Sequence, residues 1–456
     1  MKFEIIKMKR NFWISVLLLL FCFGKTSAQE KKWTLEDCIN YAVTNNIGLQ
    51  RQRLQTEIAE VNSFKSKMDL LPSLNLGSDA SIQYGRSVDP VSNSITFLQN
   101  FRNGYQLTSN IRLFNGFAAL NTISANRFML KAGLENEKIV RNTLIVDIMG
   151  QYYQVLYSRG LENASKMQLD LSEKQQFRIR KMVETGKEAL SKQYEIESQA
   201  SADKLAYTVA HNNASQALTT LKQMLQLETG SEFDILIPEL NTVLISDYNF
   251  NTDSIYSIAA VTLPRLKEIE YELKASKKQI AAARGSLAPS LSLGGQIFTG
   301  YYTLLNDTSA HSSFSNQMKN NFGQAVAVSI NIPLFNNYST ARNIKLAKIR
   351  KNDTELRLEQ EKNNLFTDIE NACLNYNRGK DEFAAANANF DYNTKSFNAV
   401  EKKFEAGLVD VTDYSAAKTT LFKAEAEALR TKLQLLIRKL TIQFYSTGEY
   451  ENIINN

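Results

Sequence analysis

The sequence predicts a mostly α-helical protein with a transmembrane β-barrel part, built from two similar halves. Three observations lead to this fold class. A set of short motifs occurs twice along the 456 residues, and two long tracts without proline have helical composition. Between the helical regions, apolar residues alternate with polar or small ones, which is the period of a β-strand.

The duplication sets the organisation of the chain. The repeated motifs lie 217 to 221 residues apart: Leu71–Gly77 with Ala288–Gly294, Asn110–Asn115 with Asn331–Asn336, and Glu184–Gly186 with Glu405–Gly407. Solenoid repeats are only about 20–50 residues long. We therefore expect one structural half to be copied once, with repeats at 29–250 and 251–456 and pseudo-symmetry within the protomer.

The first 28 residues have the organisation of a secretory signal peptide. A basic start is followed by the apolar segment Phe12–Phe23 and the small residues Thr26–Ala28. Twelve residues are too few to span a bilayer as a helix, which takes about 20. Without residues 1–28, the chain has 48 basic and 46 acidic side chains, a net charge of +2. We expect an exported protein, and this charge gives no basic surface for nucleic acid.

Residues that carry chemistry are sparse. Outside the signal the chain has two cysteines, Cys38 and Cys373, and two histidines, His211 and His311. Burial as small hydrophobic residues is favoured for the cysteines over a single disulfide, because disulfide frameworks are typical of small cysteine-dense chains. No metalloprotease, CxxC, GxSxG or P-loop spacing occurs. The sequence predicts no enzyme, no cofactor and no metal site.

The two proline-free tracts, 91–237 and 334–456, can be uninterrupted helix because proline in a helix interior costs about 3 kcal/mol. Each contains one marked break, at Gly186 and at Gly407, where glycine can end a helix. Ser191 and Thr412 follow as candidate N-caps. The tracts are therefore predicted to be helical hairpins at about 116–227 and 337–445. Their arms cover 116–184 and 188–227 in the first half, and 337–405 and 410–445 in the second.

The lengths of the helices predict how they pack. A first arm of about 69 residues is roughly 100 Å long at 1.5 Å per residue. The return arms are much shorter, but each half has a further helix before its strands, at about 47–70 and 265–287. Each of these helices and the return arm of its half together nearly match the long arm. We expect the two to stack end to end beside it. A rod of this length suits a conduit or a spacer.

Four segments are predicted to be strands, at about 74–84, 105–113, 291–301 and 322–334. Each has apolar residues on one face and small or polar residues on the other. The segment 105–113 alternates Tyr105, Leu107, Ile111 and Leu113 with polar residues, and 322–334 puts Val328 and Ile330 opposite Ser329. Long polar loops are expected at 86–103 and 302–321. Strands of about ten such residues are typical of transmembrane barrels, although a half-buried sheet in a soluble domain shares the pattern. Four strands cannot close a barrel, so copies must pool eight, twelve or sixteen strands.

The chain resembles the TolC-like outer membrane efflux proteins, also called outer membrane factors. The duplicated plan carries the resemblance, together with the opening segment Trp33–Cys38. It implies a homotrimer in the outer membrane, with a shared 12-stranded barrel and a coiled-coil periplasmic tunnel. Its function would be that of a passive exit duct in a tripartite efflux pump or a type I secretion system. A periplasmic adaptor protein, an inner-membrane transporter and outer-membrane lipid would be its partners.

The resemblance also implies site residues at the far turns of the hairpins. Five residues would form the adaptor-docking tip: Gly186, Leu190, Gly407, Leu408 and Val409. Asp413 matches an acidic residue of the periplasmic aperture in the family. Ala416 and Lys192 stand where further acidic residues would complete a second ring or its first-half counterpart. The alternative for Asp413 is a helix-terminal carboxylate that the helix dipole favours.

The alternative to the duct is an exported coiled-coil structural or adhesive protein whose β segments form a soluble cap. The apolar strand face separates the two hypotheses, because a soluble cap has no use for an apolar outer band. An enzyme is a distant third hypothesis.

Overall fold

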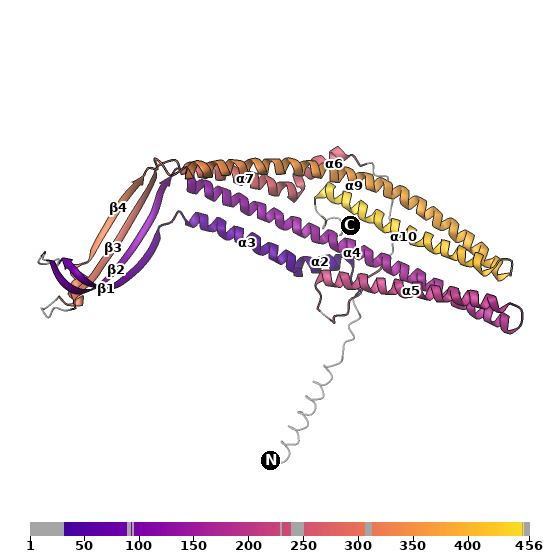
Figure 1. Cartoon of the computed structure of the whole chain (residues 1–456). Coiled ribbons are helices and arrows are strands. Elements are labelled where there is room, and N and C mark those ends of the chain that lie inside the picture. The colour runs from indigo at the N-terminus through magenta and orange to yellow at the C-terminus, as the bar shows by residue number, and fades with distance from the viewer. Residues whose placement is uncertain are drawn as a thin grey trace, which may run out of the picture.

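The structure, a computed structural model, describes residues 32–88, 93, 95–228, 230–238, 250–305, 312–448 and 450. The predicted signal peptide and His311 lie outside these residues. The molecule is elongated (Figure 1): four strands form one curved sheet at one end, and the turns of the two long helical hairpins lie at the other. Along the described residues, no helix combines the length and apolar character needed to cross a membrane.

The elements follow the duplicated plan. The first half contains α2 (Leu35–Asn45), α3 (Ile47–Met68), β1 (Ser73–Val88), β2 (Ile95–Asn115), α4 (Ala118–Glu184) and α5 (Leu190–Leu225). The second half contains α6 (Thr252–Thr262), α7 (Pro264–Gly285), β3 (Ser290–Leu304), α8 (Phe314–Asn320), β4 (Gly323–Asn331), α9 (Ser339–Glu405) and α10 (Val411–Thr447). Helix α8 has no counterpart between β1 and β2 among the described residues.

The predicted end-to-end stacking of short helices is confirmed. Helices α4 and α9 have 67 residues each, about 100 Å. Helices α3 and α5 lie in sequence along α4, and α7 and α10 lie along α9 (Figure 1). The backbone N–H of Ile47, at the start of α3, donates to Oε1 of Gln226, the C-cap of α5, at 2.9 Å. In the second half, a Cβ added to Gly448 at the end of α10 would lie 3.1 Å from Thr262 at the end of α6.

Three apolar clusters hold the helices together. One joins α2, α4, α5 and α10 and includes Cys38 and Tyr152. A second joins α6, α7, α9 and α10 and includes Cys373, and a third lies near the hairpin turns around Tyr414. Both cysteines are buried and free, in different clusters. Burial raises the pKa of the Cys38 thiol to about 12, so this cysteine acts as the small hydrophobic residue that was favoured.

The four strands pair antiparallel in the order β1-β2-β3-β4. Strands β1, β2 and β3 include the predicted strands and extend beyond them, whereas β4 is shorter than predicted. The loop expected at 86–103 is wrong, because β1 continues to Val88 and β2 begins at Ile95. Four of the five residues at 99–103 are polar, so the segment lacks the alternation of apolar and polar residues. The backbone ladder with β1 forms the strand regardless of side chain. The loop expected at 302–321 is wrong at its start for the same reason, because β3 continues to Leu304 and pairs with β2 as far as that residue.

Two further strand predictions are corrected. Strand β4 ends at Asn331 instead of 334; Pro333 has no N–H to donate to a ladder. The register of β2 with β3 shifts between Arg112 and Phe114, so Leu113 is the extra residue of a β-bulge. Phe114, and not Leu113, is the residue opposite Leu291.

Candidate functional site

The sheet has one continuous apolar face. Across β3 and β4, Leu291 is opposite Ile330 and Leu293 is opposite Val328. The stripe continues into β1 and β2, where Leu107 is opposite both Ile297 and Leu76. Several of these side chains are exposed in the single chain: Leu76 is 80% exposed and Ile330 is 68% exposed. Such a band on an unpartnered sheet needs an apolar environment to cover it.

The opposite face of the sheet is small and polar. Ser329 is opposite Ser292, which in turn is opposite Arg112. Glycine and alanine share this face at the pair of Gly294 and Ala327. The predicted faces of β3 and β4 are therefore confirmed by the register. Strands β1 and β4 are the two edges of this four-stranded sheet, and each leaves a row of backbone groups unpaired within the described chain.

The two hairpin turns have the same geometry. Gly186 has φ +69° and Gly407 has φ +72°, a left-handed conformation that favours glycine. In each turn this glycine N–H bonds back to the helix, to the carbonyls of Val183 and Phe404. The N–H of the next residue bonds to the carbonyl five positions back, with Lys187 donating to Met182 and Leu408 to Lys403. These bond pairs form a Schellman motif, so the duplication extends to the detail of the turns.

The structure brings three of the five predicted tip residues into one groove. Gly407, Leu408 and Val409 line a cavity of about 340 Å³ whose other wall includes Glu188 and Lys192 of the first hairpin. A hydrogen bond from Nη2 of Arg178 in α4 to the carbonyl of Glu405 at 2.7 Å crosses between the hairpins.

The remaining tip residues lie beside this groove and not in it. Leu190 starts α5 and is 54% exposed, whereas Leu408 is 74% exposed. Two exposed leucines next to the turns are a candidate contact surface for another protein.

Asp413 lies in the first turn of α10 and is exposed. Its backbone N–H donates to Oδ1 of Asp410 at 2.9 Å. Asp410 is thus the N-cap of α10, and the prediction of Thr412 as cap is wrong; Thr412 is already helical. Ser191 is likewise not the cap of α5, because the N-cap position is Ala189 and no side chain caps it. The chain becomes helical sooner after each glycine than the hydroxyl residues suggested.

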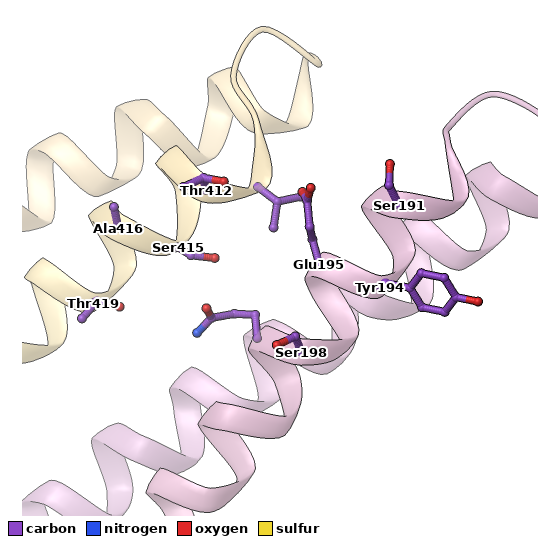
Figure 2. A pocket seen from close by; sticks show the side chains of 10 residues that line it. Ser191, Tyr194, Glu195, Ser198, Thr412, Ser415, Ala416 and Thr419 are labelled. Carbon is purple, nitrogen blue, oxygen red and sulfur yellow. The ribbon is translucent and has the colours of Figure 1, made fainter.

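A second, larger groove runs between α5 and α10 (Figure 2). Its volume is about 930 Å³, and short polar side chains line much of it, including Ser191, Ser198, Thr412 and Ser415. Ala416 of α10, which stands in place of a second acidic residue of the predicted aperture, also lines this groove. The Tyr194 ring points away from α10 (Figure 2) and is 62% exposed.

A buried charge pair joins the two hairpins, and sequence reasoning missed it. Lys418 of α10 is 3% exposed and its Nζ lies 2.5 Å from Oδ2 of Asp203 in α5. Ser172 of α4 bonds to both, and Nε2 of Gln199 donates to Oδ1 of Asp203 at 3.0 Å. Burial lowers the pKa of Lys418, and the carboxylate of Asp203 opposes that shift. No local pattern separates this lysine from solvated ones, so only the contact of three helices reveals it.

The described residues contain no group of three or more His, Cys, Asp or Glu side chains that could hold a metal ion. His211 is exposed and its Nδ1 lies 2.7 Å from Oε1 of Glu162.

The chain matches known proteins in both sequence and fold. The sequence profile described as "Outer membrane efflux protein" matches residues 255–447. The toxin and drug export protein A of Aggregatibacter actinomycetemcomitans is 20% identical over 91% of this chain and 86% of its own length.

Two solved structures have the same fold. CusC superposes with a TM-score of 0.76 at 18% identity, covering 93% of this chain and 96% of its own. The open-state MtrE outer membrane channel of Neisseria gonorrhoeae gives a TM-score of 0.74 at 19% identity, covering 90% and 88%.

Proposed function

We propose that this chain is an outer membrane efflux protein, as its similarity to that family indicates, and that three copies of it form a passive exit duct. The duct would cross the outer membrane as a shared 12-stranded barrel and the periplasm as a tunnel of long helices. The duplicated halves, 29–250 and 251–456, would then give the tunnel six similar wall units.

The apolar face of the four-stranded sheet is the observation that carries this proposal. Open sheet edges are not tolerated in lipid, so β1 and β4 must pair with strands of other copies. Twelve strands leave room for a lumen, whereas the interior of an eight-stranded barrel is filled by side chains. The small and polar face around Ser329 would then line the channel. A soluble cap would leave the apolar band uncovered, which argues against the structural or adhesive alternative.

The helical end would meet the rest of the export machinery. Helices α4 and α9 reach about 100 Å from the sheet to the turns at Gly186 and Gly407, which is enough to cross much of a periplasm. The exposed Leu190 and Leu408, with Gly186, Gly407 and Val409, would dock a periplasmic adaptor that links the duct to an inner-membrane transporter. A duct of this kind needs no catalytic residue or cofactor.

The test is to purify the mature protein from outer membranes in detergent, measure its mass and record its conductance in planar bilayers. We expect three chains per particle and discrete channel openings. Recovery as a monomer from the aqueous phase without detergent would contradict the proposal.

A further inference from the structure

Strand β3 extends beyond the end of its neighbour β4, and helix α8 lies where a longer β4 would continue the sheet. The pairing of β3 with β4 ends at Phe298 opposite Gly323, yet β3 continues to Leu304. The backbone groups of its last six residues on that side would be unpaired. An unpaired strand edge is normally covered or blunted in a stable protein.

Helix α8 covers that edge through its side chains. Oε1 of Gln317 accepts from the N–H of Tyr302 and its Nε2 donates to the carbonyl of Tyr302, both at 2.9 Å. Nδ2 of Asn321 donates to the carbonyl of Gly300 at 2.7 Å. The hydroxyl of Thr299 donates to the carbonyl of Met318 at 2.8 Å. The Gln317 amide therefore makes the two bonds that a paired residue of a strand would make.

The other side of α8 is open. Among the described elements α8 packs against β3, and its Phe314 remains 50% exposed. Its ring lies 5.3 Å from that of Tyr301. This leaves an exposed helix surface at the end of the sheet farthest from the long helices.

The edge strand β1 has an unmatched end of its own. It has 16 residues and β4 has nine, so in any register at least seven residues of β1 extend past β4 of a neighbouring copy. Both strands adjoin helices at the same end of the sheet (Figure 1), so the excess lies mainly at the opposite end, toward Val88. Tyr84 and Val88 there are 69% and 52% exposed.

The expected gap between the strands of two copies matches the diameter of a helix. Where β4 has ended, β3 of one copy and β1 of the next would be two strand spacings apart, about 10 Å. An α-helix with its side chains is about 10 Å across. We propose that α8 fills this gap as a clasp between copies, with one side bonded to its own β3 and the other side packed on the outer end of β1 of the next copy.

This inference rests on the proposed trimer, so the experiment tests the two separately. The full-length chain is made with paired cysteines and treated with a short bismaleimide cross-linker. Lys319→Cys with Arg86→Cys probes the clasp, and Asn75→Cys with Ser329→Cys probes barrel closure near the helical end. Lys319→Cys with Asp79→Cys, which lies farther down β1 on the polar face, is the control for random collisions.

We expect covalent dimers and trimers from the clasp pair and the closure pair, and none from the control pair. Products from the closure pair alone would overturn the clasp and leave the trimer intact. If neither pair gives products, the barrel closure fails and the clasp fails with it. Equal products from the clasp and control pairs would also overturn the clasp, because proximity would then not be specific.

A second variant pair tests the helix itself. Gln317→Ala removes both bonds to Tyr302, and we expect it to lower the clasp cross-link several-fold while leaving closure cross-linking unchanged. Asn316→Ala is the matched control on the same helix, since its exposed side chain makes no hydrogen bond in the described structure. An unchanged clasp cross-link in Gln317→Ala would contradict the role of α8 as a strand substitute.

Discussion

At the scale of single residues, the environment decides what each side chain contributes. Val328 and Ser329 are neighbours in the chain, but they lie on opposite faces of the sheet. Lys418 is a charged residue on a helix, yet it is buried and paired with Asp203. The alternation of residue types predicts the first case, because a strand reverses its face at every residue. No local pattern predicts the second case, because the neighbour of each helix position is set by the tertiary packing.

The strand faces make different predictions for adjacent residues. Val328→Arg would place a charge on the apolar face at mid-strand and should cost about 2–4 kcal/mol of stability in the membrane. Ser329→Arg should be tolerated and should change conductance, because it faces the lumen in the proposed barrel. Folding into lipid vesicles and single-channel recording measure both effects. Equal losses from the two variants would show that the assigned faces are wrong.

The buried pair predicts non-additive effects. Lys418→Met should destabilise the protein by about 3–5 kcal/mol, because Asp203 is left buried and unpaired. Adding Asp203→Leu should recover most of that loss. Lys423→Met on the same helix is exposed and should change stability by less than about 0.5 kcal/mol. Chemical unfolding measures the stability of the wild type, Lys418→Met, Asp203→Leu, the double variant and Lys423→Met. A double variant as unstable as the sum of the single ones would assign the effect to packing instead of charge.

At the scale of elements, the lengths of the helices and the glycines that end them organise the molecule. Two 67-residue helices set the span, and shorter helices stack along them in pairs. The turn glycines end both hairpins with the same bonds. Where one element is too short, another substitutes, as α8 does for β4 along the edge of β3.

The turn at Gly407 has a clear requirement. An added Cβ would meet no atom within 4 Å there, so the structural constraint is the φ of +72°. The proposed docking of the adaptor adds a second constraint. Gly407→Trp should abolish export while the trimer remains in the membrane. The assay measures export in cells alongside trimer level in outer membranes. Lys166→Glu, an exposed position on α4, is the control and should leave export intact. Normal export by Gly407→Trp would remove this turn from the docking site.

At the scale of the whole molecule, function depends on repetition of the chain. One copy has an apolar sheet face and two open edges; three copies in the proposed barrel would bury those edges and enclose a channel. The same symmetry would bring three copies of each tip residue around one axis. A side chain that is exposed in one copy, such as Asp413, would acquire a new environment in the proposed assembly.

The proposed aperture is a prediction at this scale. If three copies of Asp413 converge, their carboxylates repel one another and attract cations. Because Ala416 gives no second ring, cation selectivity and block by trivalent cations should be modest. Asp413→Asn should reduce both in reconstituted channels. If the substitution changes neither, Asp413 is only a helix-terminal carboxylate that the dipole of α10 stabilises.

The sequence by itself determined the features that depend on local pattern. Proline-free tracts, the turn glycines and strict alternation in β3 and β4 depend on backbone geometry within a few residues, so the hairpins, their stacking and the strand faces followed from them. The sequence also placed Gly186, Gly407 and Asp413 at the far turns.

Only the tertiary structure decided the features that depend on residues far apart in the chain. The extension of β2 through its mostly polar residues 99–103 requires the ladder with β1, and the bulge at Leu113 requires the register with β3. The bonds of Gln317 to Tyr302 depend on where β4 ends. Lys418 and Asp203 are 215 residues apart in the chain. Such contacts form because chain segments meet in space, and no local period encodes which segments meet.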